Sequence, residues 1–121
     1  MSNKEVIREF YDEVFNKWDT SSLEKYMRED YRQHNPTVEN GREGFRRFCQ
    51  RFFAMHPRME LVRLVEEGDI VVVFFRCIND GGVNKVCDIY RFDENHMLAE
   101  HWDVVQHIPE DLKPANDNGQ F

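Results

Sequence analysis

"KVCDIYRFDENHMLAEHWDVVQH", residues 85–107, is the stretch that decides the fold. It contains two runs rich in aromatic and β-branched residues, 85–92 and 97–107, separated by the turn residues Asp93-Glu94-Asn95. A connection this short allows only a hairpin of antiparallel strands. Each strand carries ionisable side chains between its aliphatic ones, so which face is buried becomes a question about function as well as packing.

Two further strands are predicted upstream, over residues 58–67 and 69–79. The turn residues Gly68-Asp69 separate them, and Asp80-Gly81-Gly82 precede the hairpin at 85–107. These spacings again allow only hairpins. We therefore expect a mainly antiparallel sheet of four to six strands, strongly curved by its twist.

An amphipathic helix is predicted at the N-terminus. Ser2 and Glu5 have the spacing of a capping box. Apolar side chains then recur at steps of three and four residues, which is typical of one helical face. The expected buried face consists of Ile7, Phe10, Tyr11, Val14 and Trp18.

Two more helices are expected before the strands. A short one would bury Leu23, Tyr26 and Met27 and end near Asp30, followed by a short strand over residues 30–36. The next would begin at "NGREGF" (40–45) and end at His56-Pro57. Its wide apolar stripe consists of Phe45, Phe48, Cys49, Phe52 and Phe53, whereas Arg42, Arg46, Arg47 and Arg51 would form its solvated back.

The 121 residues are expected to form one domain, with a polar tail over residues 108–121. A formal net charge of −7 argues against nucleic acid as a partner. The longest apolar run, "IVVVFF" (70–75), is too short to span a membrane, and the charged N-terminus is not a signal peptide. The sequence therefore predicts a cytoplasmic protein without a membrane partner.

Three cysteines, Cys49, Cys77 and Cys87, form an odd set without CxxC spacing. We expect free thiols in a reducing compartment. A Cys77–Cys87 disulfide across neighbouring strands is the alternative.

Three helices followed by a long sheet define an α+β protein. The helices would pack on the curved sheet and leave a concave pocket between the two layers. On the last strand, His101, Asp103 and Val105 share one face, and Trp102 and Val104 share the other.

The preceding strand alternates in the same way. Asp88 and Tyr90 share one face, against Cys87, Ile89 and Arg91. Both faces of the hairpin carry apolar groups, so periodicity alone does not choose the buried one. A sheet that is apolar on both faces indicates that a partner subunit covers the outer face.

The segments "YRQHNP" (31–36), "GREGF" (41–45) and "CDIYRFDENHMLAEHWDVVQ" (87–106) resemble the SnoaL-like branch of the nuclear-transport-factor-2-like superfamily. The similarity covers nearly the whole chain. It implies a conical α+β fold with a deep pocket. The superfamily includes isomerases, epoxide hydrolases, polyketide cyclases and non-enzymatic binders, so the resemblance alone does not assign an activity.

In SnoaL-like cyclases the aspartate of the "HWD" motif is the acid/base group, and that residue corresponds to Asp103. The resemblance implies chemistry without metal or cofactor, in which this carboxylate removes a proton next to a carbonyl and the enolate closes a ring. The resemblance therefore implies that His101 and Asp103 face the pocket. Trp102 and Val104 then face outward, toward the partner subunit of a homodimer.

Ketosteroid isomerases offer a second comparison. Their oxyanion-binding tyrosine and neutral aspartate correspond to Tyr11 and Asp88. Their general base corresponds to Asn35, which cannot act as a base. A base must then be Asp103 or His34, and structural roles for Tyr11 and His34 remain open.

Two histidines are expected near the base. His34, at a strand end that by resemblance lines the pocket mouth, could shuttle a proton, and His101 could tune or hydrogen-bond Asp103. Together with Asp103 or Asp88, they would make a two-histidine-one-carboxylate metal set. Neither the spacing nor the resemblance supports a metal, so no metal is expected.

The expected pocket wall consists of Asn35, Tyr90, Phe52, Phe53 and Val105. An epoxide-hydrolase relay of Asp-Arg-Asp is disfavoured because Arg91 and Asp88 lie on opposite faces of their strand. The resulting hypothesis is a small cofactor-independent enzyme that performs proton-transfer chemistry on an apolar carbonyl compound. The alternative is a non-catalytic module that uses the same pocket to bind an apolar small molecule.

Overall fold

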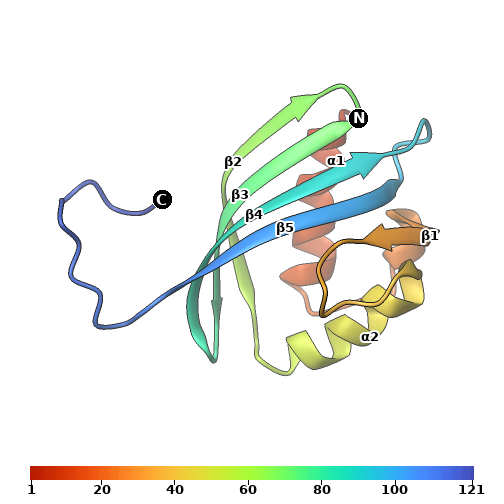
Figure 1. Cartoon of the computed structure of the whole chain (residues 1–121). Coiled ribbons are helices and arrows are strands. Elements are labelled where there is room, and N and C mark those ends of the chain that lie inside the picture. The colour runs from red at the N-terminus through yellow and green to blue at the C-terminus, as the bar shows by residue number, and fades with distance from the viewer.

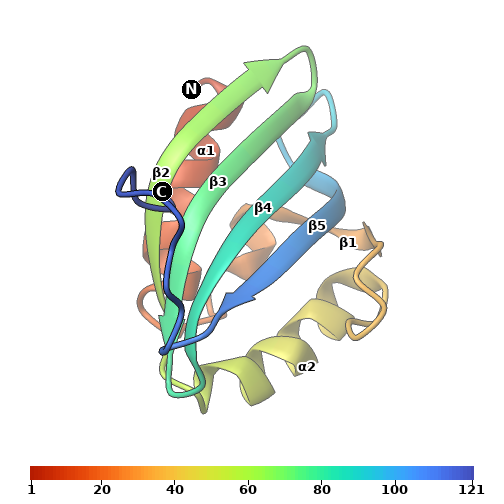
Figure 2. The same ribbon diagram turned by 60° about the vertical axis from the view of Figure 1, so that its left-hand side comes forward.

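A curved five-stranded sheet wraps around an N-terminal helix in the computed structural model, which describes residues 1–121 (Figures 1 and 2). The helices are α1 (Asn3–Phe10) and α2 (Gly41–Phe53), and α2 lies across the open lower end of the curve (Figure 1). The strands are β1 (Met27–Gln33), β2 (Arg58–Glu67), β3 (Ile70–Asn79), β4 (Gly82–Phe92) and β5 (Leu98–Ile108). The predicted α+β cone is confirmed.

The sheet has the strand order β1-β5-β4-β3-β2. Strands β2 to β5 form the predicted antiparallel meander, because connections of two, two and five residues leave no other pairing. Strand β1 instead pairs in parallel with β5. The sheet is therefore mixed, and this parallel pair brings a segment from the N-terminal third against the last strand.

Helix α1 begins at the predicted capping box. The Glu5 backbone N–H donates to Ser2 Oγ over 3.2 Å, and the Ser2 N–H donates to Glu5 Oε2 over 3.0 Å. The helix continues as a π-helical turn over Tyr11–Phe15, which buries Tyr11, Val14 and Phe15.

The expectation that Trp18 packs inward is wrong. Its side chain is 46% exposed, and its indole N–H donates to the carbonyl of Pro57 over 2.7 Å. The π-helical turn ends the 3.6-residue repeat before Trp18. Trp18 itself has a φ of 52°, so the helical pattern no longer places it on the buried face.

The predicted second helix is only a 3₁₀ turn, Leu23–Lys25, and β1 already begins at Met27. The segment forms a strand instead of a helix because it pairs with β5. Leu98 donates its backbone N–H to the Tyr26 carbonyl over 2.7 Å, and Met27 pairs with Leu98. The three side chains expected to be buried, Leu23, Tyr26 and Met27, are buried all the same. Helix α2 follows as predicted and ends at Phe53, before His56-Pro57.

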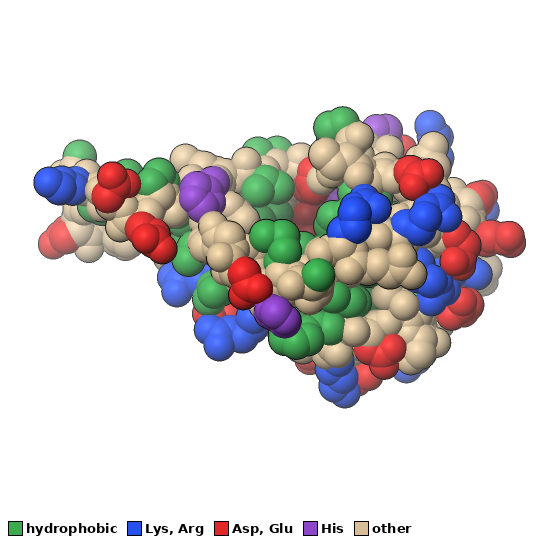
Figure 3. Space-filling view, turned by 90° about the horizontal axis from the view of Figure 1, so that it is seen from below, with side chains coloured by type: hydrophobic (Ala, Val, Ile, Leu, Met, Phe, Trp, Pro, Cys, Tyr) green, Lys and Arg blue, Asp and Glu red, His purple; other side chains and the backbone are tan.

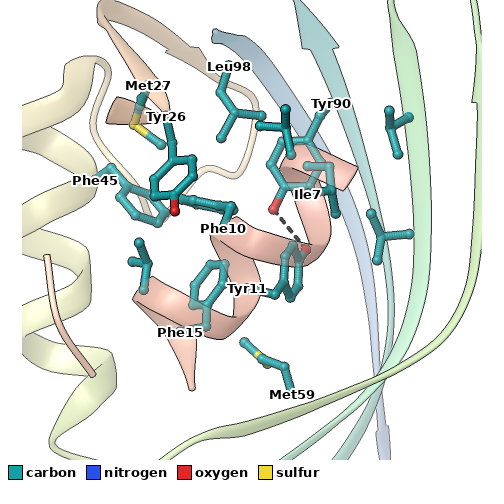
Figure 4. Close-up of a cluster of buried hydrophobic side chains, with 14 of the residues drawn as sticks. Ile7, Phe10, Tyr11, Phe15, Tyr26, Met27, Phe45, Met59, Tyr90 and Leu98 are labelled. Atoms are coloured by element: carbon teal, nitrogen blue, oxygen red, sulfur yellow. Dashed lines mark hydrogen bonds between the residues drawn. The ribbon is translucent and has the colours of Figure 1, made fainter. Parts of the chain in front are cut away.

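The core lies between α1 and the inner face of the sheet (Figure 4). It is dominated by aromatic rings in edge-to-face contact, with Phe10 at the centre of a group that includes Tyr11, Phe15, Tyr26 and Tyr90. Tyr11 projects from the helical segment toward Tyr90 on the sheet (Figure 4). The aromatic core therefore fixes the position of the helix over the strands that carry the candidate site.

The three cysteines are free thiols. Cys77 on β3 pairs with Asn84 of β4, whereas Cys87 pairs with Phe74, so the two sulfurs belong to different residue pairs and opposite faces. The alternative of a Cys77–Cys87 disulfide is therefore wrong. No helix of this protein has the length and apolar character needed to cross a membrane.

The polar tail contains no helix or strand after Ile108. It turns back across the outer face of the sheet, in front of β2 and β3 (Figure 2). Its last residue, Phe121, stacks on Phe74 with ring centroids 6.0 Å apart, and the Arg76 guanidinium lies 4.4 Å from the Phe121 ring centroid.

Candidate functional site

A cavity of about 140 Å³ lies between α2 and the inner face of the sheet. The antiparallel register of β4 and β5 places Asp88 opposite Asp103 and Tyr90 opposite His101, and all four line this cavity. Twelve of the eighteen lining residues are hydrophobic, so the carboxylates face a mostly apolar space. In the view from below, hydrophobic side chains gather around a hollow beside the sheet (Figure 3).

Three successive residues at the end of β1 each bind one residue of β5. His101 Nδ1 lies 2.6 Å from Gln33 Oε1, His34 Nε2 lies 2.7 Å from Glu100 Oε2, and the Asn35 amide donates to Asp103 Oδ2 over 2.8 Å. The backbone N–H of His34 also donates to the His101 carbonyl over 3.0 Å. The parallel β1–β5 pairing therefore joins two segments that are far apart in the sequence, "QHN" (33–35) and "EHWD" (100–103).

Asp88 is the centre of a buried hydrogen-bond network. Its Oδ2 accepts hydrogen bonds from the hydroxyls of Tyr11 and Tyr90, the latter over 3.1 Å, and its Oδ1 lies 3.1 Å from His101 Nε2. Only 5% of Asp88 is exposed. A buried carboxyl group needs hydrogen-bond partners of this kind, and Asp88 has three of them.

The two tyrosines of this network remain protonated. Burial raises the pKa of Tyr11 well above its ordinary value of 10.0, and the negative charge of Asp88 raises it further. The same two causes raise the pKa of Tyr90. Both hydroxyls therefore serve as donors to Asp88 rather than as titrating groups.

His101 faces an acceptor at each ring nitrogen. Gln33 presents its carbonyl oxygen to Nδ1, and Asp88 presents its carboxylate to Nε2. These two contacts fix the orientation of the imidazole ring. Both nitrogens are thereby occupied, and the hydrogen bond expected between His101 and Asp103 does not form.

The expectation that His34 lines the pocket mouth is wrong. Gln33 and Asn35 point inward, so alternation along the extended chain turns His34 to the outer face. There its ring stacks on Trp102, with centroids 4.7 Å apart and planes 7° from parallel. It binds Glu100, whose other oxygen accepts from Arg91 over 3.0 Å.

This outer cluster of His34, Glu100, Arg91 and Trp102 was not expected from the sequence. The hydrogen bond with His34, followed by that with Arg91, holds the pKa of Glu100 below its ordinary value of 4.5. The cluster supports the back of the strand that carries Asp103. The separation of Arg91 from Asp88, expected from alternation, is confirmed by this pairing.

The other expected site residues divide between the cavity and its surroundings. Asn35, Tyr90, Phe52 and Val105 line the cavity, whereas Phe53 packs against the core without reaching the cavity wall. Tyr11 is fully buried behind Asp88 and does not line the cavity either.

Sequence reasoning missed several cavity residues, chief among them Gln33 and Asn84. Alternation would have found both: Gln33 lies two residues before Asn35, and Asn84 lies four residues before Asp88 on the same strand face. The remaining missed wall residues are Phe15, Tyr31, Val38, Phe45, Phe48, Met59, Phe75, Cys77 and Val86.

The ligand-type atoms of Asp88, His101 and Asp103 all lie within 4.8 Å of one another. This two-carboxylate-one-histidine set differs from the set considered from the sequence, because His34 is on the other face of the sheet. Each of the three already has a protein partner, and no buried side-chain nitrogen or oxygen lacks one. A cation would have to displace His101 from Asp88, so the donor set fits a hydrogen-bonded site better than a metal centre.

The chain belongs to the SnoaL-like domain family, whose sequence model matches residues 7–101. Its curved sheet and helices have the cone architecture of nuclear-transport-factor-2-like proteins. No curated protein sequence matches the chain.

Solved structures with this fold include proteins of different names. TsrD from Streptomyces laurentii is 26% identical with a TM-score of 0.72, and the match covers 84% of this chain and 86% of that chain. A SnoaL-like polyketide cyclase from Agrobacterium tumefaciens is 17% identical, with a TM-score of 0.73 and coverages of 88% and 92%. A steroid delta-isomerase from Pseudomonas aeruginosa is 16% identical, with a TM-score of 0.69 and coverages of 86% and 79%. At identities this low, the last two similarities concern the fold alone.

Proposed function

We propose that this protein is a cofactor-independent acid/base enzyme that isomerises or cyclises an apolar carbonyl compound. One observation carries the proposal: the Asp103 carboxylate is held by the Asn35 amide at the wall of a mostly apolar cavity, beside the buried Asp88–His101 pair. A few polar and ionisable groups that converge in a mostly apolar cavity are typical of ligand-binding and catalytic sites.

Asp103 is the proposed general base. Asn35 binds its Oδ2, and its other oxygen has no partner within the protein. That free oxygen can take a proton from the carbon next to a substrate carbonyl, because the amide holds the carboxylate in one orientation. The electron pair of the broken C–H bond then forms an enolate.

His101 is the proposed stabiliser of the enolate. One of its ring nitrogens lies within 4.8 Å of a carboxylate oxygen of Asp103, so the imidazole is placed to stabilise negative charge that develops on the substrate. Tyr11 and Asp88, expected from the sequence to donate to the oxyanion themselves, act here through His101. Their hydroxyl and carboxylate groups already bind each other and hold the imidazole ring.

Two outcomes follow from the same enolate. Return of the proton from Asp103 to a different carbon gives an isomer. Attack of the enolate carbon on a second carbonyl of the same molecule gives a ring, and Asp103 then protonates the new alkoxide. Both reactions balance without an added cofactor, and both suit a cavity that is apolar except at one wall.

The test compares Asp103→Asn with Asp69→Asn, a matched control at the exposed β2–β3 turn. A panel of apolar ketones and epoxides is first screened by thermal shift, because a specific ligand raises the melting temperature. Compounds that bind are then assayed for turnover. Asp103→Asn should abolish turnover and preserve binding, while Asp69→Asn preserves both.

Equal loss of binding and turnover in Asp103→Asn, or no effect on either, would contradict a base at this position. Tight binding without turnover by the unmodified protein would instead support the non-catalytic binding module.

We also propose that the protein is a homodimer that buries the outer face of the sheet. Val104 is 67% exposed on this face, and Trp102, Ile89 and Cys87 extend the apolar surface across β4 and β5. A second copy of the chain presents the same apolar surface, as a twofold interface requires. The free thiols favour the cytoplasm as the place where the protein works.

A further inference from the structure

The inner wall of β4 and β5 consists of three successive cross-strand pairs. Asp88 faces Asp103, Val86 faces Val105, and Asn84 faces His107. Asn84 and Asp88 are four positions apart along β4, so their Cα atoms are separated by roughly 13 Å. The wall therefore changes from carboxylates to valines to an amide–imidazole pair along one line.

Asn84 lines the same cavity as Asp103. Its Oδ1 lies 3.1 Å from Nδ1 of the exposed His107, and its NH₂ group donates to no group of the protein. No buried side-chain nitrogen or oxygen lacks a partner, so this NH₂ group is accessible to solvent, and a ligand that displaces the solvent must offer an acceptor in its place.

We propose that Asn84 forms a distal binding subsite for an oxygen acceptor, either carbonyl or hydroxyl, at the far end of the substrate. This proposal rests on the proposed function for the reacting end. The substrate is then an elongated molecule with a reacting carbonyl at Asp103, an apolar middle against Val86 and Val105, and a second oxygen about 10 Å from the first. His107 is a positioning residue that orients the amide.

Selectivity follows from the same geometry. A substrate without the second oxygen would cover the Asn84 amide with apolar surface and leave its hydrogens unpaired, and a site of this kind rejects such an analogue. Access is open at this end, because Val105 is 54% exposed and His107 is exposed as well.

Two ketones of equal length test the subsite: decan-2-one, and decane-2,9-dione, which differs only by a second carbonyl near the far end. Binding is measured by calorimetry in the Asp103→Asn background, so that turnover does not interfere. The dione should bind roughly three- to tenfold more tightly, the effect of one neutral hydrogen bond, beyond the statistical factor of its two equal ends.

Asn84→Leu should remove this preference and leave the affinity for decan-2-one unchanged or improved. The control Asn118→Leu makes the same chemical change in the exposed tail and should keep the preference. In nitrogen-15 NMR spectra, the side-chain amide signal of Asn84 should shift with the dione and not with decan-2-one.

Equal affinities, no binding of either ketone, or a preference that survives Asn84→Leu would each overturn the subsite. The experiment measures binding alone, so its result is independent of whether Asp103 is a base. Loss of the proposed catalytic function with an intact dione preference would leave the subsite standing, as a feature of a binding protein.

Discussion

The side-chain amide of Asn35 donates to Oδ2 of Asp103 over 2.8 Å, joining the end of β1 to the middle of β5. Asn35 occupies the position that corresponds to the general base of ketosteroid isomerases, and it cannot remove a proton. Here the amide holds the carboxylate of Asp103, which we propose as the base. In that proposal the base lies on β5, and Asn35 supports it.

Asn35→Leu should lower turnover by about ten- to a hundredfold, because Asp103 loses the bond that orients it. Steady-state kinetics on any substrate found in the screen measures the effect. Thr37→Val is the control, since it removes only the Thr37 hydroxyl that binds Asn35 Oδ1 and leaves the amide on Asp103. Unchanged turnover in Asn35→Leu would contradict an orienting role.

Tyr11→Phe should destabilise the fold by about 1–3 kcal/mol, because Asp88 loses a buried donor without gaining another. Urea unfolding monitored by circular dichroism measures this. Tyr26→Phe removes a hydroxyl that binds the more exposed Glu9, and should cost about 1 kcal/mol or less. Equal costs for the two variants would show that burial of Asp88 does not set the effect.

The ion pairs of Glu100 predict a fall in stability at acid pH. His34 and Arg91 hold its folded-state pKa below the ordinary 4.5, so the ionised form is favoured in the folded protein. The stabilisation is therefore present above pH 4.5 and is lost as the pH falls through the lower folded-state pKa. Urea unfolding over a series of pH values should show the loss, and Glu100→Gln should flatten it. Glu110→Gln, in the exposed tail, should retain the wild-type profile.

The cysteines should differ in reactivity. Burial raises the pKa of Cys49 to about 12 and that of Cys77 to about 11, so neither forms much thiolate near neutral pH. Cys87 is less buried, but it lies beside Val104 on the face proposed for the dimer, so it should be alkylated first by iodoacetamide in a Val104→Glu variant that uncovers this face. Intact-mass spectrometry of that variant should show one label under native conditions and three in urea. Rapid labelling of Cys49 in the native protein would contradict its burial.

Light scattering tests the proposed homodimer. At micromolar concentration the protein should have the mass of two chains. Val104→Glu places a charge on the outer face and should give the mass of one chain. Met55→Glu, beyond α2, should remain dimeric. A monomeric wild-type protein would refute the dimer.

Much of the fold was predictable because its signals are local. The capping box of Ser2 and Glu5 and the turns at Gly68-Asp69 and Asp80-Gly81-Gly82 act within a few residues. The helix start and both hairpins are confirmed there, although β4 begins at Gly82, earlier than the predicted residue 85. The errors occur where distant contacts override local preference. Residues 27–30 have a helical pattern, yet pairing with β5 at Leu98 makes them part of strand β1.

The candidate site was harder to predict for the same reason. Alternation sorted Asp88, His101 and Asp103 onto one face, but both faces were apolar, and only the family resemblance chose between them. His34 was misplaced because nothing in the sequence shows how β1 lies against β5.

The sequence by itself determined which strands and turns form and which side chains share a face, since these depend on chain geometry over a few residues. Only the tertiary structure decided which faces meet. The parallel pairing of β1 with β5, a long-range contact, sets Gln33, His34 and Asn35 against His101, Glu100 and Asp103. That pairing turns three ordinary polar residues into the support of a candidate active site.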